Sequence, residues 1–130
     1  NEKIKALVSA TRGEGYGLPL LEASACGLPV MATNWSGHLD FLNNGKFISF
    51  DYDLRPVPAE RIDNEIFMNG TRWAEVRERD FKIKLRKFYK GSQKPKEWAV
   101  EMSKIIKEKY SQDAVSEIYT KVMNGKLWQI

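Results

Sequence analysis

The sequence is poor in the residues that build disulfides, metal centres and membrane spans. It has one cysteine and one histidine among 130 residues, so an internal disulfide is excluded, and no His, Cys or Asp cluster has metal-ligand spacing. No apolar run approaches the roughly 18 residues of a membrane span, and the first residues do not form a signal peptide. A single thiol suits a reducing compartment. We expect a cytoplasmic protein with no intrinsic metal and no cofactor.

The composition is that of a folded globular chain. Hydrophobic residues make up 42% and charged residues 29% of the sequence, close to ordinary values for globular domains. A chain of 130 residues has the length of one domain. The sequence therefore predicts a single unit built around one core.

Two acidic residues flank a glycine-containing loop near the N-terminus. Glu14 precedes and Glu22 follows the run GYGLPLL at 15–21. A carboxylate accepts two hydrogen bonds at once, and charge-assisted bonds to the vicinal hydroxyls of a sugar or ribose are strong. We expect one carboxylate in the loop and the other one turn into the following helix, so that both face one ligand. This pattern indicates recognition of a polyol.

The loop also predicts an anion site. Gly15 and Gly17 can adopt positive φ and let a bound group approach the backbone closely, while Pro19 suits the start of a helix. The pattern predicts a helix over 18–26, closed by Gly27 as a C-terminal cap. The free amides and the positive dipole end of such a helix favour a phosphate or diphosphate.

A longer stretch around this loop resembles a known family. Residues 9–30, SATRGEGYGLPLLEASACGLPV, resemble the donor-binding signature of retaining GT-B glycosyltransferases, often called glycosyltransferase family 4. Residues 32–40, ATNWSGHLD, are similar to the G-G-x-x-E loop of that family, with Ser36 in place of a glycine and Asp40 in place of the glutamate. The resemblance implies a nucleotide-diphosphate sugar donor and transfer with retention of configuration.

The resemblance also implies roles for individual residues. Glu14 matches the acid that lies beside the transferred sugar, and we take it as the catalytic candidate. Glu22 matches the acid that binds the ribose hydroxyls. The substrate-binding backbone amides belong to the loop between them, at Gly15, Tyr16, Gly17 and Leu18.

Alternation of apolar and turn-forming segments predicts an α/β fold. The expected elements are a strand over 6–10, the helix over 18–26, a strand over 29–33, a short helix capped at 36 or 37 and ended near 44–45, and a strand over 47–50. Such alternation favours a parallel sheet with crossover helices. With the resemblance, it implies a Rossmann-like, three-layer domain with helices on both faces of the sheet. Both ligand loops would then follow the carboxyl ends of strands, where open α/β sheets bind ligands.

The rest of the chain divides into an irregular loop and a helical region. Pro56 and Pro58 interrupt any periodicity across 51–71, which predicts a loop with one turn. The RWAE sequence at 72–75 resembles the W-A-E-P-D segment of the same family. Apolar residues then recur at helical spacing up to the C-terminus, and we expect them to pack in the core. The predicted organisation is a core over 1–50, a loop over 51–72 and helices over 73–130.

The resembled enzymes place the active site in a cleft between two Rossmann-like domains. At 130 residues, the chain is expected to be part of the C-terminal, donor-binding domain and to be inactive alone. Its missing partner would be an N-terminal domain that binds the acceptor, which is a glycan, a lipid or a protein. Alternatives are a non-catalytic nucleotide- or sugar-binding domain of the same fold, and a GT-B-like sugar-nucleotide epimerase.

Positive charge gathers in residues 72–109, which hold thirteen Lys or Arg against six Asp or Glu. We interpret this segment as a solvated helix face. The alternative is a basic interaction module for an anionic membrane surface or a nucleic acid. Nucleic acid is disfavoured because the specific signature lies outside the basic segment. Peripheral membrane contact stays open.

Five residues also have simpler interpretations. Glu14 and Glu22 could each be a solvated acid. Arg12 could serve only to neutralise Glu14. Cys26 and His38 lie in separate segments, and we expect Cys26 to be a buried, packed thiol on the apolar helix.

Overall fold

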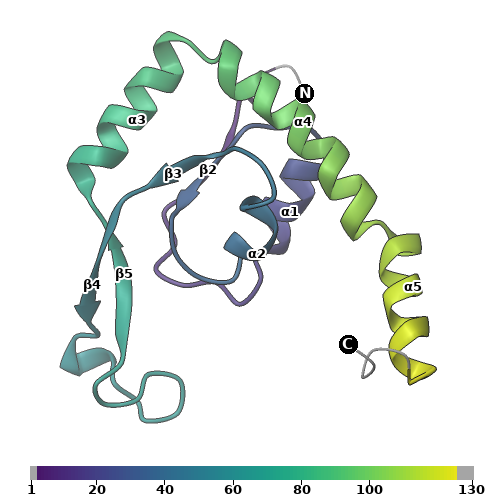
Figure 1. Cartoon of the computed structure of the whole chain (residues 1–130). Helices are drawn as coiled ribbons and strands as arrows, with labels where there is room; N and C mark the ends of the chain where they lie inside the picture. The colour runs from purple at the N-terminus through teal and green to yellow at the C-terminus, as the bar shows by residue number, and fades with distance from the viewer. Residues whose placement is uncertain (1–2, 126–130) are drawn as a thin grey trace.

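The computed structural model describes residues 3–125, in which strands alternate with helices before a helical tail (Figure 1). The elements are β1 (Leu7–Ser9), α1 (Leu18–Ala25), β2 (Val30–Thr33), α2 (Leu39–Leu42), β3 (Ile48–Phe50), β4 (Tyr52–Pro56), the 3-10 turn η1 (Ala59–Arg61), β5 (Arg72–Val76), α3 (Glu78–Lys90), α4 (Gln93–Tyr110) and α5 (Gln112–Met123). The order predicted for the first 50 residues is confirmed. The ends of the predicted organisation, 1–2 and 126–130, lie outside the described residues.

Three parallel strands form the central sheet in the order β1-β2-β3. Val8 lies opposite Met31, and Ala32 lies opposite Ser49. All four residues of β2 are buried, as expected for the middle strand of a parallel sheet. The chain therefore has the predicted α/β, Rossmann-like fold.

Helix α1 begins at a left-handed glycine and ends at another. Gly17 precedes the helix with φ of 85°, and Pro19 lies in the first turn, where a missing amide is tolerated. Gly27 follows the helix with φ of 72°. The prediction that Cys26 is buried is wrong, since this residue is exposed. Ser24 points into the core, so position 26, two residues along the helix, lies on the opposite side.

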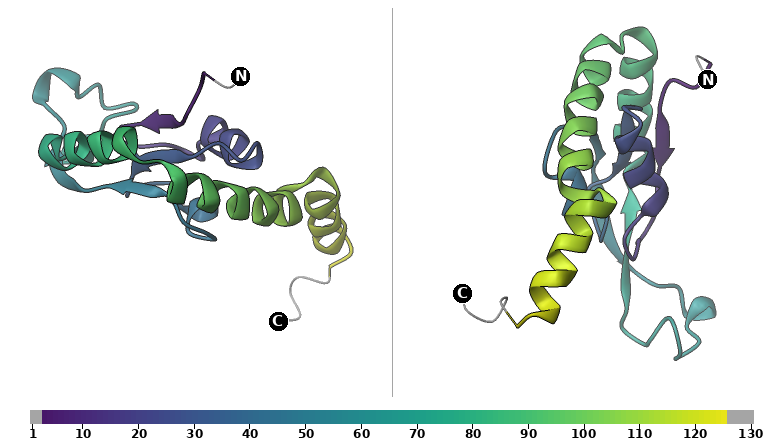
Figure 2. Two further views of the ribbon diagram at one scale, coloured as in Figure 1. Left: turned by 90° about the horizontal axis from the view of Figure 1, so that it is seen from above. Right: turned by 90° about the vertical axis from the view of Figure 1, so that its right-hand side faces the viewer.

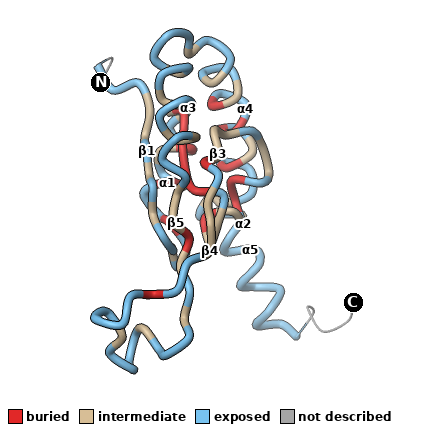
Figure 3. Tube along the Cα trace, turned by 90° about the vertical axis from the view of Figure 1, so that its left-hand side faces the viewer, coloured by how far each residue is buried: buried red, intermediate tan, exposed pale blue. Residues whose placement is uncertain are grey.

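The core lies between the sheet and helices α1, α2 and α4, where buried residues gather (Figure 3). Helix α4 packs along α1, and its Ser103 hydroxyl donates to the Ala25 carbonyl at 2.6 Å. Helix α4 thereby holds α1 against the sheet. The buried cluster consists of Leu20, Val30, Ala32, Phe41, Leu42, Met102 and Ile106.

The segment between β3 and α3 contains a β-hairpin. Strands β4 and β5 pair antiparallel, with Leu54 opposite Ala74. The prediction of an irregular loop over 51–72 is therefore wrong over β4, and the prediction of helical structure from residue 73 is wrong over β5. Pro56 is tolerated because it is the last residue of β4. The Ala74 amide donates to the Arg12 carbonyl at 3.1 Å, which ties the hairpin to the chain after β1. The far end of the hairpin extends away from the sheet (Figure 2).

The C-terminal helices form where predicted, but they do not all pack in the core. Phe81 of α3 contacts Phe50 of β3, with ring centroids 4.7 Å apart. In α5, however, Ile118 and Tyr119 are 52% and 68% exposed. Figure 1 shows α5 extending beyond the sheet, so the apolar face predicted to be buried has nothing beneath it in the described part of the chain.

Candidate functional site

The loop between β1 and α1 is held against the loop after β2. The Ser36 hydroxyl accepts from the Glu14 amide at 2.8 Å and donates to the Glu14 carbonyl at 2.7 Å. The Gly37 amide donates to the same carbonyl at 3.1 Å. The two loops therefore meet at the carboxyl ends of neighbouring parallel strands, the edge at which α/β sheets bind ligands.

The backbone of both loops needs glycine or a glycine-like conformation. A Cβ at position 37 would lie 1.9 Å from the Gly15 carbonyl oxygen, and a Cβ at position 17 would lie 2.9 Å from the His38 Cβ. Ser36 has φ of 88°, a left-handed value that costs a serine energy. Its two hydrogen bonds to Glu14 offset that cost and explain how serine can occupy a position where the resembled loop has glycine.

A run of four consecutive amides in this loop is open to a ligand. Within residues 3–125, the backbone N–H groups at 15–18 donate to no protein acceptor. Gly17, in the left-handed conformation, turns the chain directly into the first turn of α1. Successive free amides beside a helix N-terminus form a positively polarised concavity that suits an anion.

The two acidic candidates differ in position and burial. Glu14 is half-buried in the loop, whereas Glu22 is exposed on α1. Glu22 lies four residues after Leu18, so both are on the same face of the helix. Neither carboxylate makes a hydrogen bond or an ion pair with the described part of the chain. Both are therefore free to accept bonds from a ligand.

Tyr16 closes the apolar side of the loop. Its ring packs against the buried Phe41, with centroids 5.5 Å apart, and it stays 37% exposed. Burial raises the pKa of the Tyr16 phenol, and nearby Tyr110 and Asp40 add to the increase. The phenol is thus a neutral hydrogen-bond donor at neutral pH.

His38 is fully buried beneath the loop, which the sequence did not reveal. Its Nε2 lies 2.7 Å from the Thr33 carbonyl, and because a carbonyl only accepts, Nε2 carries the proton. The other ring nitrogen, Nδ1, is buried without a hydrogen-bond partner among residues 3–125. The available sequence signal was the place of His38 in the loop after β2, directly before α2.

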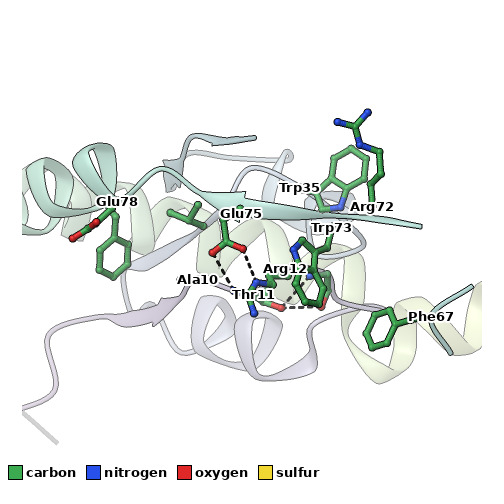
Figure 4. A pocket seen from close by; sticks show the side chains of 12 residues that line it. Ala10, Thr11, Arg12, Trp35, Phe67, Arg72, Trp73, Glu75 and Glu78 are labelled. Carbon is green, nitrogen blue, oxygen red and sulfur yellow. Dashed lines mark hydrogen bonds and ion pairs between the residues drawn. The ribbon is translucent and has the colours of Figure 1, made fainter. Parts of the chain in front are cut away.

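A cavity of about 930 Å³ opens beside the loop, between the chain after β1 and strand β5 (Figure 4). Gly13 contributes to the lining of this cavity, whereas Glu14, Glu22 and the loop residues between them do not. Two tryptophans, Trp35 and Trp73, contribute to its wall. Sequence reasoning missed this cavity because it depends on the hairpin.

Arg12 pairs with a residue of this cavity rather than with Glu14. Its Nε and Nη2 donate to the two Glu75 carboxylate oxygens at 2.8 and 3.1 Å. The hydrogen bonds from Arg12 lower the pKa of Glu75, and the same bonds raise the pKa of Arg12. The interpretation of Arg12 as a neutralising partner of Glu14 is therefore wrong.

Membrane-spanning helices and metal-binding clusters are both absent from the described residues. In the part of the chain that the structure describes, no helix has the length and apolar character needed to cross a bilayer. No group of three or more His, Cys, Asp or Glu side chains within that part could hold a metal ion.

A family model described as "Glycosyl transferases group 1" matches residues 2–104. The chain belongs to the group 1 glycosyltransferases. The match covers the sheet, the glycine loop, the hairpin and most of α4. No match was found among curated proteins or among solved structures. As a group 1 glycosyltransferase domain, the chain takes part in glycosyl transfer, which in general needs a sugar donor and an acceptor.

Proposed function

We propose that this group 1 glycosyltransferase chain binds a nucleotide-diphosphate sugar and presents it for transfer with retention of configuration. The observation that carries the proposal is the run of free amides at 15–18, which leads into α1 between two unpaired carboxylates. Amides suit the diphosphate, and carboxylates suit the hydroxyls of ribose and sugar.

Each acid has its own part in this proposal. Glu22, on the exposed face of α1, would accept hydrogen bonds from the ribose hydroxyls. Glu14 would lie beside the transferred sugar and stabilise the transition state, in which the anomeric carbon carries positive charge. The amides at 15–18 would stabilise the negative charge that develops on the leaving diphosphate. Preorganised groups of this kind act without rearranging during the reaction.

This chain's share of the reaction is placement of the donor. We propose that acceptor binding and further catalytic contacts come from a second, N-terminal domain of the complete protein. The 130-residue chain alone would then bind donor without transferring sugar. Retained donor binding with no turnover is the expected result for the isolated chain, and adding the second domain should restore turnover.

The role of Glu22 is tested by calorimetry with a panel of nucleotide-diphosphate sugars. Glu22→Ala should weaken donor binding roughly tenfold or more, because each charge-assisted hydrogen bond is worth about 1.5–3 kcal/mol. Glu101→Ala is the matched control, since it removes an exposed helical acid on α4. Equal donor affinity in both variants would refute the assigned role.

The role of Glu14 is tested by comparing binding with turnover. In the complete protein, Glu14→Gln should reduce kcat more than donor affinity, since this acid is assigned to the transition state. The backbone hydrogen bonds to Ser36 do not involve its carboxylate, so the loop should keep its shape. A proportional loss of both quantities would contradict the separation of roles.

A further inference from the structure

We propose that a groove between β3 and the bend from α3 to α4 binds a small anionic amphiphile, a molecule with one negatively charged head group on an apolar chain. The groove has a volume of about 470 Å³, within the range of sites for small ligands. Figure 1 shows α3 and α4 meeting at the bend, where Gly91 and Ser92 separate the two helices. None of the residues assigned to the donor lines this groove.

The walls of the groove are largely apolar and come from three segments. Phe47 precedes β3, Phe88 belongs to α3 and Trp98 belongs to α4, and all three side chains are half-buried. Phe47 packs against the buried core cluster, and Trp98 directly precedes the buried Ala99. Aromatic walls supported in this way offer a large contact area at low entropic cost. The apolar lining consists of Phe47, Ile48, Phe88, Pro95 and Trp98.

Three lysines and no acidic residue line the groove. The Lys84 Nζ is already paired, at 2.8 Å from an Asp80 oxygen and 3.3 Å from an Asp51 oxygen. Within residues 3–125, the ammonium groups of Lys87 and Lys94 make no hydrogen bond or ion pair. Two exposed positive charges are therefore available to form charge-assisted bonds with an anionic head group.

The walls and the charges together select the class of ligand. A neutral apolar molecule would fill the walls but leave both lysines without an anion. A sugar phosphate or a nucleic acid would pair with the lysines but leave the apolar walls in contact with water. A membrane surface is flat on this scale, so it would reach the exposed lysines but not the half-buried walls. An anionic head on a single apolar chain satisfies both parts of the lining.

The groove lies at the opposite end of the sheet from the proposed donor loop. Ile48, which lines the groove, is the first residue of β3, whereas the glycine loop follows the carboxyl end of β1. Because β1, β2 and β3 are parallel, these positions mark opposite ends of the strands. The groove also shares no lining residue with the cavity beside the glycine loop. The amphiphile is therefore a ligand of a separate site and not a substrate of the transfer.

The test is an NMR titration of the chain with octanoate, butyrate and 1-octanol at millimolar concentrations. The indole N–H signal of Trp98 reports on the groove, while Trp35 and Trp73 lie outside it. Octanoate should shift the Trp98 signal in a saturable way and leave the other two unchanged. No shift of Trp98 with octanoate, or equal shifts of all three signals, would overturn the proposal.

The two other probes test the two halves of the ligand. Butyrate lacks four methylene groups and should bind roughly tenfold more weakly or worse, because less apolar surface is buried. The alcohol 1-octanol keeps the chain but lacks the charge, and it should also bind roughly tenfold more weakly, by loss of charge-assisted bonds. Affinity equal to that of octanoate, for either probe, would refute the amphiphile assignment.

A pair of double variants separates the groove lysines from general charge effects. Lys87→Gln with Lys94→Gln should raise the dissociation constant for octanoate roughly tenfold. Lys104→Gln with Lys107→Gln removes the same charge from exposed positions of α4 outside the groove, and it should leave octanoate binding unchanged. Equal affinity in both double variants would count against the site.

Two further outcomes distinguish this site from other binding. Sedimentation of the chain with phosphatidylglycerol vesicles, without any octanoate binding, would indicate a membrane contact and refute the groove ligand. Displacement of octanoate by a nucleotide-diphosphate sugar would place octanoate in the donor loop and would also refute the groove. Nucleotide-sugar binding that depends on Glu22, without octanoate binding, would refute the groove ligand and leave the proposed function standing.

Discussion

Single glycines determine the shape of the candidate donor site. Gly17 combines a left-handed φ of 85° with a close approach to His38, whereas Gly70, in the hairpin loop, has nearly the same φ of 84° but open space around it. Conformational strain and steric conflict can therefore be separated in one chain.

Gly17→Ala should destabilise the protein more than Gly70→Ala. Both variants place an alanine in the left-handed region, which lowers the free energy of unfolding by about 1–2 kcal/mol. At position 17 the new Cβ would also lie 2.9 Å from the His38 Cβ, and crowding of this kind adds roughly 1–3 kcal/mol. Urea denaturation measures the free energy of unfolding of each variant. Equal losses would mean that His38 gives way, and that the loop is less tightly fixed than described.

The sequence pattern predicted the local conformation of the loop before α1, but not the contacts of the residues around it. The glycines and Pro19 specify a local conformation, so the start of α1 could be inferred from sequence. The pairing of Arg12 with Glu75, 63 positions away, could not, because nothing local distinguishes Glu75 from Glu14 as a partner. Burial of His38 likewise depends on two loops that meet only in the folded chain.

At the scale of elements, helix α4 holds the first half of the domain together. Met102 is 2% exposed and belongs to the same buried cluster as Leu20 of α1. Val100, two residues earlier on the same helix, is 55% exposed. One helix thus offers a core position and a surface position of similar apolar character.

Met102→Ala should lower the free energy of unfolding by about 2–5 kcal/mol, because it leaves a cavity in the core. Val100→Ala should change it by less than about 0.5 kcal/mol, as for most surface positions. The measurement is chemical denaturation followed by circular dichroism. A small loss for Met102→Ala would show that α4 is not part of the cooperative core.

The hairpin should be the element most sensitive to acid. Hydrogen bonds from Arg77 lower the pKa of Asp53, those from Arg12 lower the pKa of Glu75, and backbone amides lower the pKa of Asp63. A carboxylate whose pKa is lowered in the folded state stabilises the fold at pH values above its ordinary pKa, which is 3.8 for Asp and 4.5 for Glu. This contribution to stability is lost as the pH falls through the folded-state pKa.

We expect the NMR signal of Trp73 to lose its native position below about pH 4, before signals of the core. Asp53→Asn should weaken this acid response, since it removes one of the titrating groups. Core signals that disappear first, with Trp73 unchanged, would contradict a hairpin held by ionised carboxylates.

Elements were predictable where periodicity alone decides them. The β-α-β pattern of the first 50 residues emerged because buried strands and glycine-capped helices are local signals. The hairpin was missed because Pro56 and Pro58 resemble breakers, although Pro56 ends β4 without interrupting its pairing. The apolar spacing of α5 correctly predicted a helix, but spacing cannot tell whether another element covers the apolar face.

At the scale of the whole molecule, the proposed donor loop and the cavity share one edge of the fold. The parallel sheet brings the loops after β1 and β2 to the same end, and the hairpin joins them from the side through the Arg12 carbonyl. The glycine loop between β1 and α1 leads into the start of α1. Residues of β5 and the start of α3 line the cavity. The proposed donor loop and the cavity therefore lie side by side in the described part of the chain.

The most direct test is to map where a nucleotide-diphosphate sugar binds, using backbone amide NMR signals during a titration. We predict saturable changes concentrated at residues 15–22, where free amides lead into α1 between the two acids. Saturable binding that leaves these amides unchanged, or no binding of any nucleotide-diphosphate sugar, would contradict the central claim.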